Sequence, residues 1–129
     1  MTAAGALDDP VLCDRLVQLQ GQVLAMKYHA LRLLTCALKG EPAGVAGLIV
    51  KLNGCQLNHD LCALALEAMG ELGVLYHRAK YERARGAWMY QYLFSLGLII
   101  GGGTAQIQKN IIGERGLGLP REPRGEEKR

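Results

Sequence analysis

The fold of this chain is decided by residues 8–40, which read DDPVLCDRLVQLQGQVLAMKYHALRLLTCALKG. Asp9 before Pro10 predicts a helix start, because an Asp side chain caps the first unpaired N–H groups and proline fits the first turn. Gly40 predicts the end of the helix, and Lys39 just before it suits the negative end of the helix dipole. We therefore expect one long helix between these two signals.

Apolar residues recur along this helix at spacings of three and four, which predicts a continuous packing face. A second apolar row follows at a spacing of seven. A helix with two apolar rows is contacted from two sides, so we expect it inside a bundle or at a contact between subunits. The first row is Leu12, Leu16, Leu19, Val23, Met26, Ala30, Leu33 and Ala37, and the second is Val17, Leu24, Leu31 and Leu38.

The remainder of the chain also has helical patterns. After a short turn at 40–44, a second helix is expected over about 45–69, antiparallel to the first because the turn is short. The polar stretch 77–85 is helical or irregular, and the apolar stretch 88–100 predicts a third helix. With no strand-like alternation, these patterns alone predict an all-α helical bundle.

The last helix is expected from about Ala105 to Glu114 or Arg115, and Pro120 stops the chain from continuing it. We expect Ile107, Ile111 and Ile112 to face inward, and Gln108, Lys109 and Arg115 to face outward. The charged residues 122–129 predict a disordered tail.

Composition narrows the class of protein. The 129 residues suffice for one domain, half are hydrophobic and 5% are aromatic, a mixture typical of helices packed on helices. A net charge of +3, with no aromatic residues among the charges of the tail, is a weak signal for nucleic acid, so none is expected as a partner. No apolar run approaches the roughly 20 residues that span a bilayer.

The cysteines and the N-terminus suggest a cytoplasmic protein without a metal. No CxxC pair occurs among the four cysteines, so a zinc site is not expected. Cys55 and Cys62, seven residues apart on one helix face, are interpreted as buried free thiols. The N-terminus has neither the basic region nor the apolar core of a secretory signal. Free thiols and the lack of a signal fit a reducing cytoplasm.

The candidate ligand site is the segment 101–121, GGGTAQIQKNIIGERGLGLPR. Thr104 is interpreted as a helix N-cap after a glycine run, and helix N-termini attract anions. The segment is no P-loop, because no GK[ST] follows the glycines. From spacing alone it is either a flexible joint or a ligand site. His59, the one polar member of the second helix's apolar face, is interpreted as a partly covered histidine rather than a ligand.

The same segment resembles the end of the acyl-CoA dehydrogenases, flavoproteins whose last helices read like GGTSEIQRNIIAERVLGLPR. Residues 50–70, VKLNGCQLNHDLCALALEAMG, resemble the second long helix of that family's C-terminal domain, and the opening of the first helix resembles its counterpart. The matching residues are Gly102, Gly103, Thr104, Gln106, Ile107, Gln108, Asn110, Ile111, Ile112, Glu114, Arg115, Leu117, Gly118, Leu119, Pro120 and Arg121.

The resemblance covers about residues 8–121 and implies an all-α, four-helix up-and-down bundle. It also implies an FAD-dependent enzyme that dehydrogenates an acyl-CoA thioester between its α and β carbons. It implies that Thr104 and Gln106 contact FAD and that Gly103 lies near the thioester. It also implies that the turn with Gly70 and Gly73 approaches the FAD of a neighbouring subunit, although Glu71 stands where many members have another glycine.

The chain departs from the family pattern at Gly102, where many members carry the catalytic glutamate. No catalytic residue is therefore assigned. Without the family's N-terminal helices and β-domain, the chain is expected to be inactive alone. The alternative is a non-catalytic subunit that assembles through its helix faces, either with copies of itself or with a catalytic partner.

Overall fold

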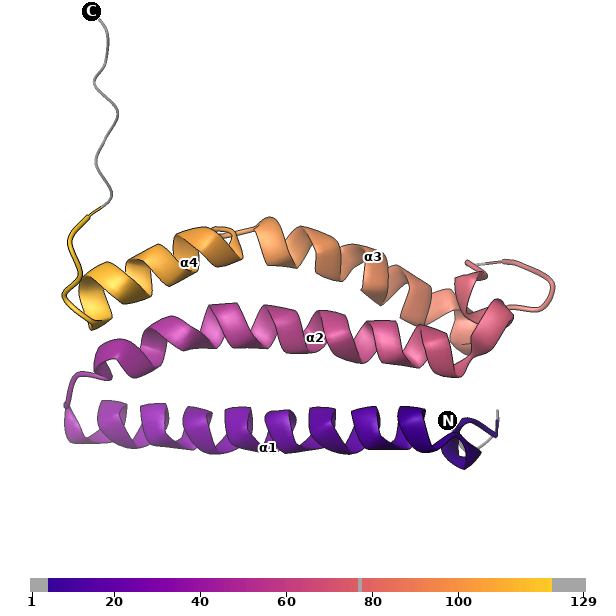
Figure 1. The fold of residues 1–129 in the computed structure, drawn as a ribbon, viewed down its shortest axis with the longest axis horizontal. Coiled ribbons are helices and arrows are strands. Elements are labelled where there is room, and N and C mark those ends of the chain that lie inside the picture. Colours follow the sequence, from indigo (N-terminus) through magenta and orange to yellow (C-terminus); the bar gives the residue numbers. More distant parts are fainter. Residues whose placement is uncertain (1–4, 77, 122–129) are drawn as a thin grey trace, which may run out of the picture.

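The computed structural model describes residues 5–76 and 78–121, so the predicted disorder of 122–129 lies outside the described residues. This part of the chain is all-α: it contains four α-helices and no strand, which confirms the predicted fold class. The helices are α1 (Pro10–Lys39), α2 (Ile49–Ala68), α3 (Ala87–Ile100) and α4 (Ala105–Ile111) (Figure 1).

The helices lie in one flat layer with α2 in the middle (Figure 1). α1 and α2 are antiparallel neighbours, as the short turn predicted. α3 and α4 run end to end along the other side of α2, and both contact it. The fourth helix thus continues the line of the third, and the junction between them lies beside the N-terminal half of α2.

Both ends of α1 confirm the local signals in the sequence. The Asp9 carboxylate accepts hydrogen bonds from the backbone N–H groups of Val11 at 2.8 Å and Leu12 at 3.3 Å. At the other end Gly40 has a φ of 69°, and its N–H donates to the carbonyl of Ala37. These contacts satisfy backbone groups that a helix leaves unpaired at its ends.

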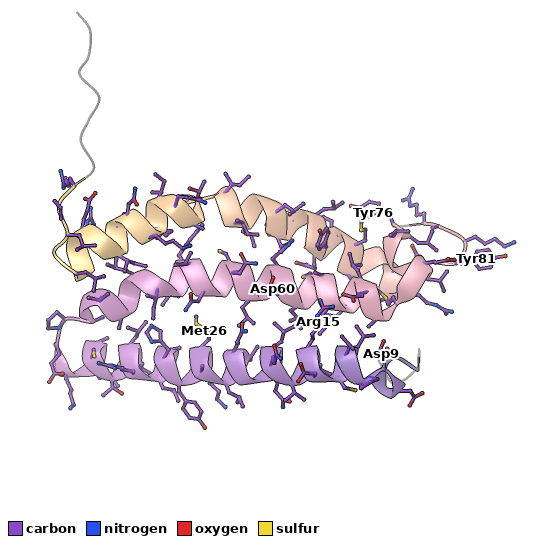
Figure 2. All side chains as sticks on the ribbon, in the orientation of Figure 1. Asp9, Arg15, Met26, Asp60, Tyr76 and Tyr81 are labelled. Atoms are coloured by element: carbon purple, nitrogen blue, oxygen red, sulfur yellow. The ribbon has the colours of Figure 1, made fainter. Side chains whose placement is uncertain are left out.

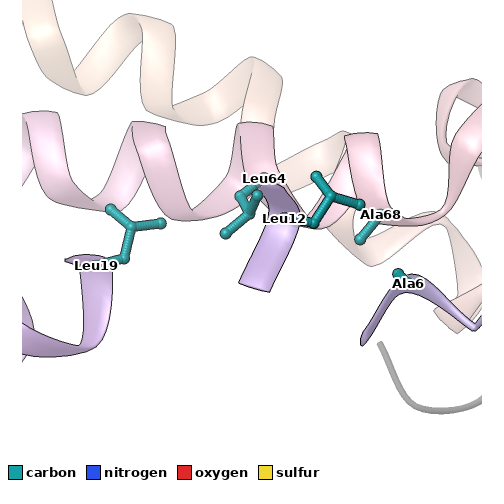
Figure 3. Packing of buried hydrophobic residues seen from close by; sticks show 5 residues of the cluster. All are labelled: Ala6, Leu12, Leu19, Leu64 and Ala68. Atoms are coloured by element: carbon teal, nitrogen blue, oxygen red, sulfur yellow. The ribbon is translucent and has the colours of Figure 1, made fainter. Parts of the chain in front are cut away.

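The core lies where the first half of α1 meets the second half of α2. It consists of Ala6, Leu12, Leu19, Leu64 and Ala68, with Leu16, Leu57 and Leu61 packed against it (Figure 3). Leu64 is only 1% exposed. The predicted first row of α1 is therefore buried at this end of the layer.

Farther along α1 the same row loses its cover, and Val23, Ala30 and Ala37 are exposed. A hollow of about 330 Å³ separates α1 from α2 there, lined by Gln22, Ala25, Met26, Asn53, Gln56 and Leu57. Met26 extends from α1 toward this space (Figure 2). The apolar row therefore does not form a continuous core along the whole of α1.

The second row of α1 is exposed, with 64%, 45%, 49% and 80% of Val17, Leu24, Leu31 and Leu38 accessible. No element among residues 5–76 and 78–121 buries these side chains. Of the two alternatives from the sequence, a place inside this chain's own bundle is therefore wrong for this row, and a contact between subunits remains.

Short 3-10 turns connect the long helices. The turn Gly44–Leu48 leads into α2, Gly70–Val74 follows it, and Ala84–Gly86 precedes α3. The polar stretch before α3 is mostly irregular rather than helical where it is described. Within the described ranges, no helix has the length and apolar character that a membrane crossing requires.

Candidate functional site

The candidate site is the junction Gly101–Thr104, which joins α3 to α4. Gly102 and Gly103 have φ values of 69° and 104°, a region that favours glycine. Thr104 caps α4: its side chain accepts a hydrogen bond from the N–H of Ile107 at 3.4 Å, which confirms the predicted N-cap. The junction therefore exposes a stretch of backbone with no side chain before the first turn of α4.

Two side chains fasten the carbonyl groups around this junction. The Lys51 ammonium, from α2, donates to the carbonyl of Ile99 at 3.0 Å and to that of Gly103 at 2.5 Å. The Gln108 amide, from α4, donates to the carbonyl of Gly102 at 2.8 Å. These hydrogen bonds restrain the glycine backbone at three carbonyl groups.

The predicted faces of α4 are wrong at two positions. Ile107 was expected inside but is 51% exposed, and Gln108 was expected outside but is 9% exposed. The reason is the hydrogen bond that Gln108 makes to the junction, which turns this side of α4 toward the chain. Ile111 and Ile112 are half-buried, whereas Lys109 and Arg115 are exposed as expected.

The residues assigned to a ligand fall into two groups. Gly103 and Thr104 are half-buried at the junction and Gln106 is exposed in the first turn of α4, so these three lie together. Gly70 and Gly73 lie in the turn after α2, at the end of the layer and away from the junction (Figure 1). Gly70 is exposed and Gly73 is buried.

Gly102 is exposed, and a β-carbon there would have no neighbour closer than Cε of Lys51 at 4.0 Å. The position therefore has space for a side chain but carries no acid or base. The junction supplies backbone groups, a hydroxyl and an amide, and it provides no group that removes a proton from carbon at this position.

His59 has structural partners. Its Nδ1 lies 2.9 Å from the hydroxyl of Ser95, and that hydroxyl donates to the carbonyl of Tyr92 at 2.6 Å. Because the single Ser95 proton is used in this way, His59 Nδ1 is assigned as the donor to Ser95. The imidazole also stacks on Tyr92 with 5.0 Å between ring centroids. These contacts agree with the interpretation of a partly covered histidine.

The thiols and possible metal ligands add no second site. Cys62 is buried, and burial raises the pKa of its thiol, so it stays protonated; Cys55 is half-buried rather than fully buried as expected. In the described ranges no three His, Cys, Asp or Glu side chains are placed to hold a metal ion.

Sequence reasoning missed both fastening residues. Lys51 stands in the stretch that resembles the family's second helix, but nothing local in the sequence shows that it reaches Ile99 and Gly103. Gln108 was read as outward because it is polar. The one signal in the sequence was that Lys51 stands among apolar residues of α2, which indicates that its ammonium has a polar partner.

Comparison with known proteins identifies a family and individual relatives that this chain resembles. Residues 2–117 match the family described as "Acyl-CoA dehydrogenase, C-terminal domain". Acyl-CoA dehydrogenase IpdE1 of Mycolicibacterium smegmatis is 35% identical over 121 residues, which are 94% of this chain and 29% of that protein. Acyl-CoA dehydrogenase IpdE1 of Mycobacterium tuberculosis is 32% identical over 120 residues, 93% of this chain and 30% of that protein.

Solved structures share the fold. A structure described as the Tcur3481–Tcur3483 steroid ACAD has a TM-score of 0.81 and 19% identity over 92% of this chain and 31% of that chain. The ChsE4–ChsE5 complex from Mycobacterium tuberculosis has a TM-score of 0.77 and 25% identity over 91% of this chain and 30% of that chain. The chain thus spans somewhat under a third of the length of the proteins that it matches.

Proposed function

The chain belongs to the acyl-CoA dehydrogenase family, whose C-terminal domain it matches, and from this premise we propose that it is the helical domain of an FAD-dependent acyl-CoA dehydrogenase. The enzyme would form a double bond between the α and β carbons of an acyl-CoA thioester. The chain spans 29% and 30% of its curated relatives, so we propose that other domains, on the same or another polypeptide, complete the flavin pocket.

The observation that carries the proposal is the fixed junction between α3 and α4. A β-carbon on Gly103 would lie 3.0 Å from Nε2 of Gln108 and 3.3 Å from Cγ2 of Ile107, so glycine keeps this bend open for close approach. The Thr104 hydroxyl and the exposed Gln106 amide stand beside it and supply hydrogen bonds of the kind that orient a polar cofactor.

These residues fit the edge of a flavin site. In the proposed complex Thr104 and Gln106 contact FAD, and the backbone at Gly103 lies near the thioester. FAD supplies the hydride acceptor for the β-carbon. The junction has no residue that could act as a base. The role of its residues in this proposal is therefore to hold and orient the cofactor.

The base that removes the α-proton must come from another segment. It has to reach the α-carbon on the face opposite the flavin ring. Since position 102 has no carboxylate, we propose that this residue belongs to the domains that complete the pocket. A cytoplasmic location remains a prediction from the sequence.

Assembly with the completing polypeptide tests this function. We expect the complex to retain FAD and to lose the absorbance of oxidised flavin when acyl-CoA is added. Linear and steroid-derived thioesters are both to be tried, because one of the structures that share the fold is described as a steroid ACAD. A complex that forms but neither retains nor reduces flavin contradicts the proposal.

Gln106→Ala sharpens the test, because the side chain is exposed and its removal leaves the fold intact. We expect the dissociation constant of FAD in the complex to rise about fivefold, the worth of roughly one hydrogen bond. Lys109→Ala, on the same helix and also exposed, is the matched control and should not change flavin binding. Equal effects of the two changes contradict a specific contact at Gln106.

A second candidate is a non-catalytic partner subunit. Two observations favour it: position 102 lacks a carboxylate, and the α1 row of Val17, Leu24, Leu31 and Leu38 is exposed. The ChsE4–ChsE5 structure is itself described as a complex. In this case the row would bind another subunit, and the junction would serve assembly alone.

Gly102→Glu separates the two candidates in the assembled complex. If the pocket is complete except for its base, the new carboxylate should raise the rate of flavin reduction by about 100-fold, a typical contribution of general base catalysis. Gly102→Gln is the control, because it has the same backbone strain without a base. No gain with either variant in a complex that is already active supports a base on another segment, whereas no gain in a silent complex supports the second candidate.

A further inference from the structure

We infer that Lys51 is a positioning residue that fixes the α3–α4 junction and thereby the proposed flavin contacts on it. The inference concerns a side chain on α2 whose hydrogen bonds go to the backbone carbonyls of Ile99 and Gly103. Its functional part rests on the proposed function, but its structural part does not. The two parts are therefore tested separately.

The ammonium of Lys51 joins two pieces of backbone that are far from it in the sequence. It donates to the carbonyl of Ile99, 48 residues away, at 3.0 Å and to that of Gly103, 52 residues away, at 2.5 Å. Ile99 lies in the last turn of α3, where carbonyl groups have no partner within the helix and the dipole is negative. One positive group therefore caps α3 and holds the residue two positions before α4 begins.

The Lys51 ammonium makes its hydrogen bonds to backbone carbonyl groups and not to a carboxylate. The ion pairs among the described residues are Arg15–Glu67 and Arg121–Glu114, and neither includes Lys51. Hydrogen bonds from a charged donor are about twice as strong as those between neutral groups. The Lys51 bridge is thus a stronger tether than the single amide bond from Gln108 to the Gly102 carbonyl.

The junction needs such a tether because of its composition. Three glycines in succession place little restriction on the backbone, so this segment is costly to order without external contacts. Lys51 and Gln108 together fasten the carbonyls of Gly102 and Gly103. The α2 helix, itself packed on both sides, thereby sets where the junction lies.

Amide hydrogen exchange on the 129-residue chain tests the structural part. The amides of Gly101 and Gly103 donate to the carbonyls of Gly97 and Ile100. In Lys51→Met, exchange of these two amides should accelerate by about tenfold, because the backbone that carries them loses its hydrogen bonds to a charged group. The protection of α1 and of the core half of α2 should stay unchanged. Lys51→Arg should restore most of the protection, and Lys109→Met, on the exposed face of α4, should have no effect.

Two results overturn this part: unchanged exchange at the junction, or exchange that accelerates equally in all helices. The first shows that Lys51 does not hold the junction, and the second shows a general role in stability. Should Lys51→Met fail to fold, Lys51→Gln carries the same test, because its shorter neutral amide weakens the same bridge.

The functional part is tested in the assembled, flavin-loaded complex. Lys51→Met should lower the rate of flavin reduction at saturating acyl-CoA by about tenfold while the complex still forms, and Lys51→Arg should recover most of that rate. An unchanged rate overturns it. If the wild-type complex does not reduce flavin at all, the proposed function fails, whereas the exchange result on the isolated chain still decides the structural part.

Discussion

Gly73→Ala is expected to lower the free energy of unfolding by about 3 kcal/mol, the upper part of the usual range for overpacking. A β-carbon at this position would collide with the carbonyl oxygen of Leu66 and would lie 3.1 Å from its carbonyl carbon. These atoms are backbone of α2, so they cannot move aside as a flexible side chain would. The turn Gly70–Val74 would have to lift off α2.

Gly21→Ala is the matched control, because it adds the same methyl group in the middle of α1, where nothing lies within 4 Å. It should stabilise the chain by about 0.5–1 kcal/mol through helix propensity. Chemical unfolding followed by circular dichroism measures both variants. A loss below about 1 kcal/mol for Gly73→Ala would mean that the turn does not pack closely on α2.

This result also bears on the predicted role of the turn. Its glycines were assigned to a neighbouring subunit's FAD by resemblance alone. In the structure Gly73 is buried against α2, and this close packing by itself requires a glycine at the position. Gly70, which is exposed with a φ of 60°, is the member of the pair that remains available for such a contact. We keep that contact as a proposal for Gly70.

The parts of the fold that could be predicted from the sequence depend on local signals. Asp9, Pro10 and Gly40 set both ends of α1, because caps act on backbone groups only a few residues away. Thr104 was placed correctly as the N-cap of α4 for the same reason. The helices follow from the spacing of apolar residues in α1, α2 and α4 and from the apolar stretch of α3, signals that each segment carries by itself.

The parts that could not be predicted depend on contacts between distant segments. Lys51 reaches residues 48 and 52 positions away, and no local pattern encodes that reach. Gln108 is buried because a backbone carbonyl recruits its amide, whereas polarity alone predicted an outward side chain. Both errors concern the junction, where the fold depends on polar tethers rather than on apolar burial.

Leu64→Ala is expected to lower the free energy of unfolding by about 3 kcal/mol, within the range of about 2–5 kcal/mol for this substitution in a core. Leu64 is only 1% exposed within the apolar cluster that joins α1 to α2. It also borders a hollow of about 270 Å³ lined by Leu16, Leu61, Leu64, Ala65, Ala68, Met69 and Trp88. Leu64→Ala removes three carbon atoms and so enlarges this hollow. Because the surrounding side chains already leave it unfilled, we expect little inward movement to offset the loss of packing.

Leu38→Ala is the matched control, since 80% of this leucine is accessible on the uncovered row of α1. It should change the stability of the dilute chain by less than about 0.5 kcal/mol. Hydrogen exchange then distinguishes the core from the junction: Leu64→Ala should accelerate exchange throughout α1 and α2, whereas Lys51→Met should do so only at the amides of Gly101 and Gly103. If Leu64→Ala cost no more than Leu38→Ala, the contact between α1 and α2 would not be the main source of stability. The flat layer would then depend on a partner that covers the row of Val17, Leu24, Leu31 and Leu38.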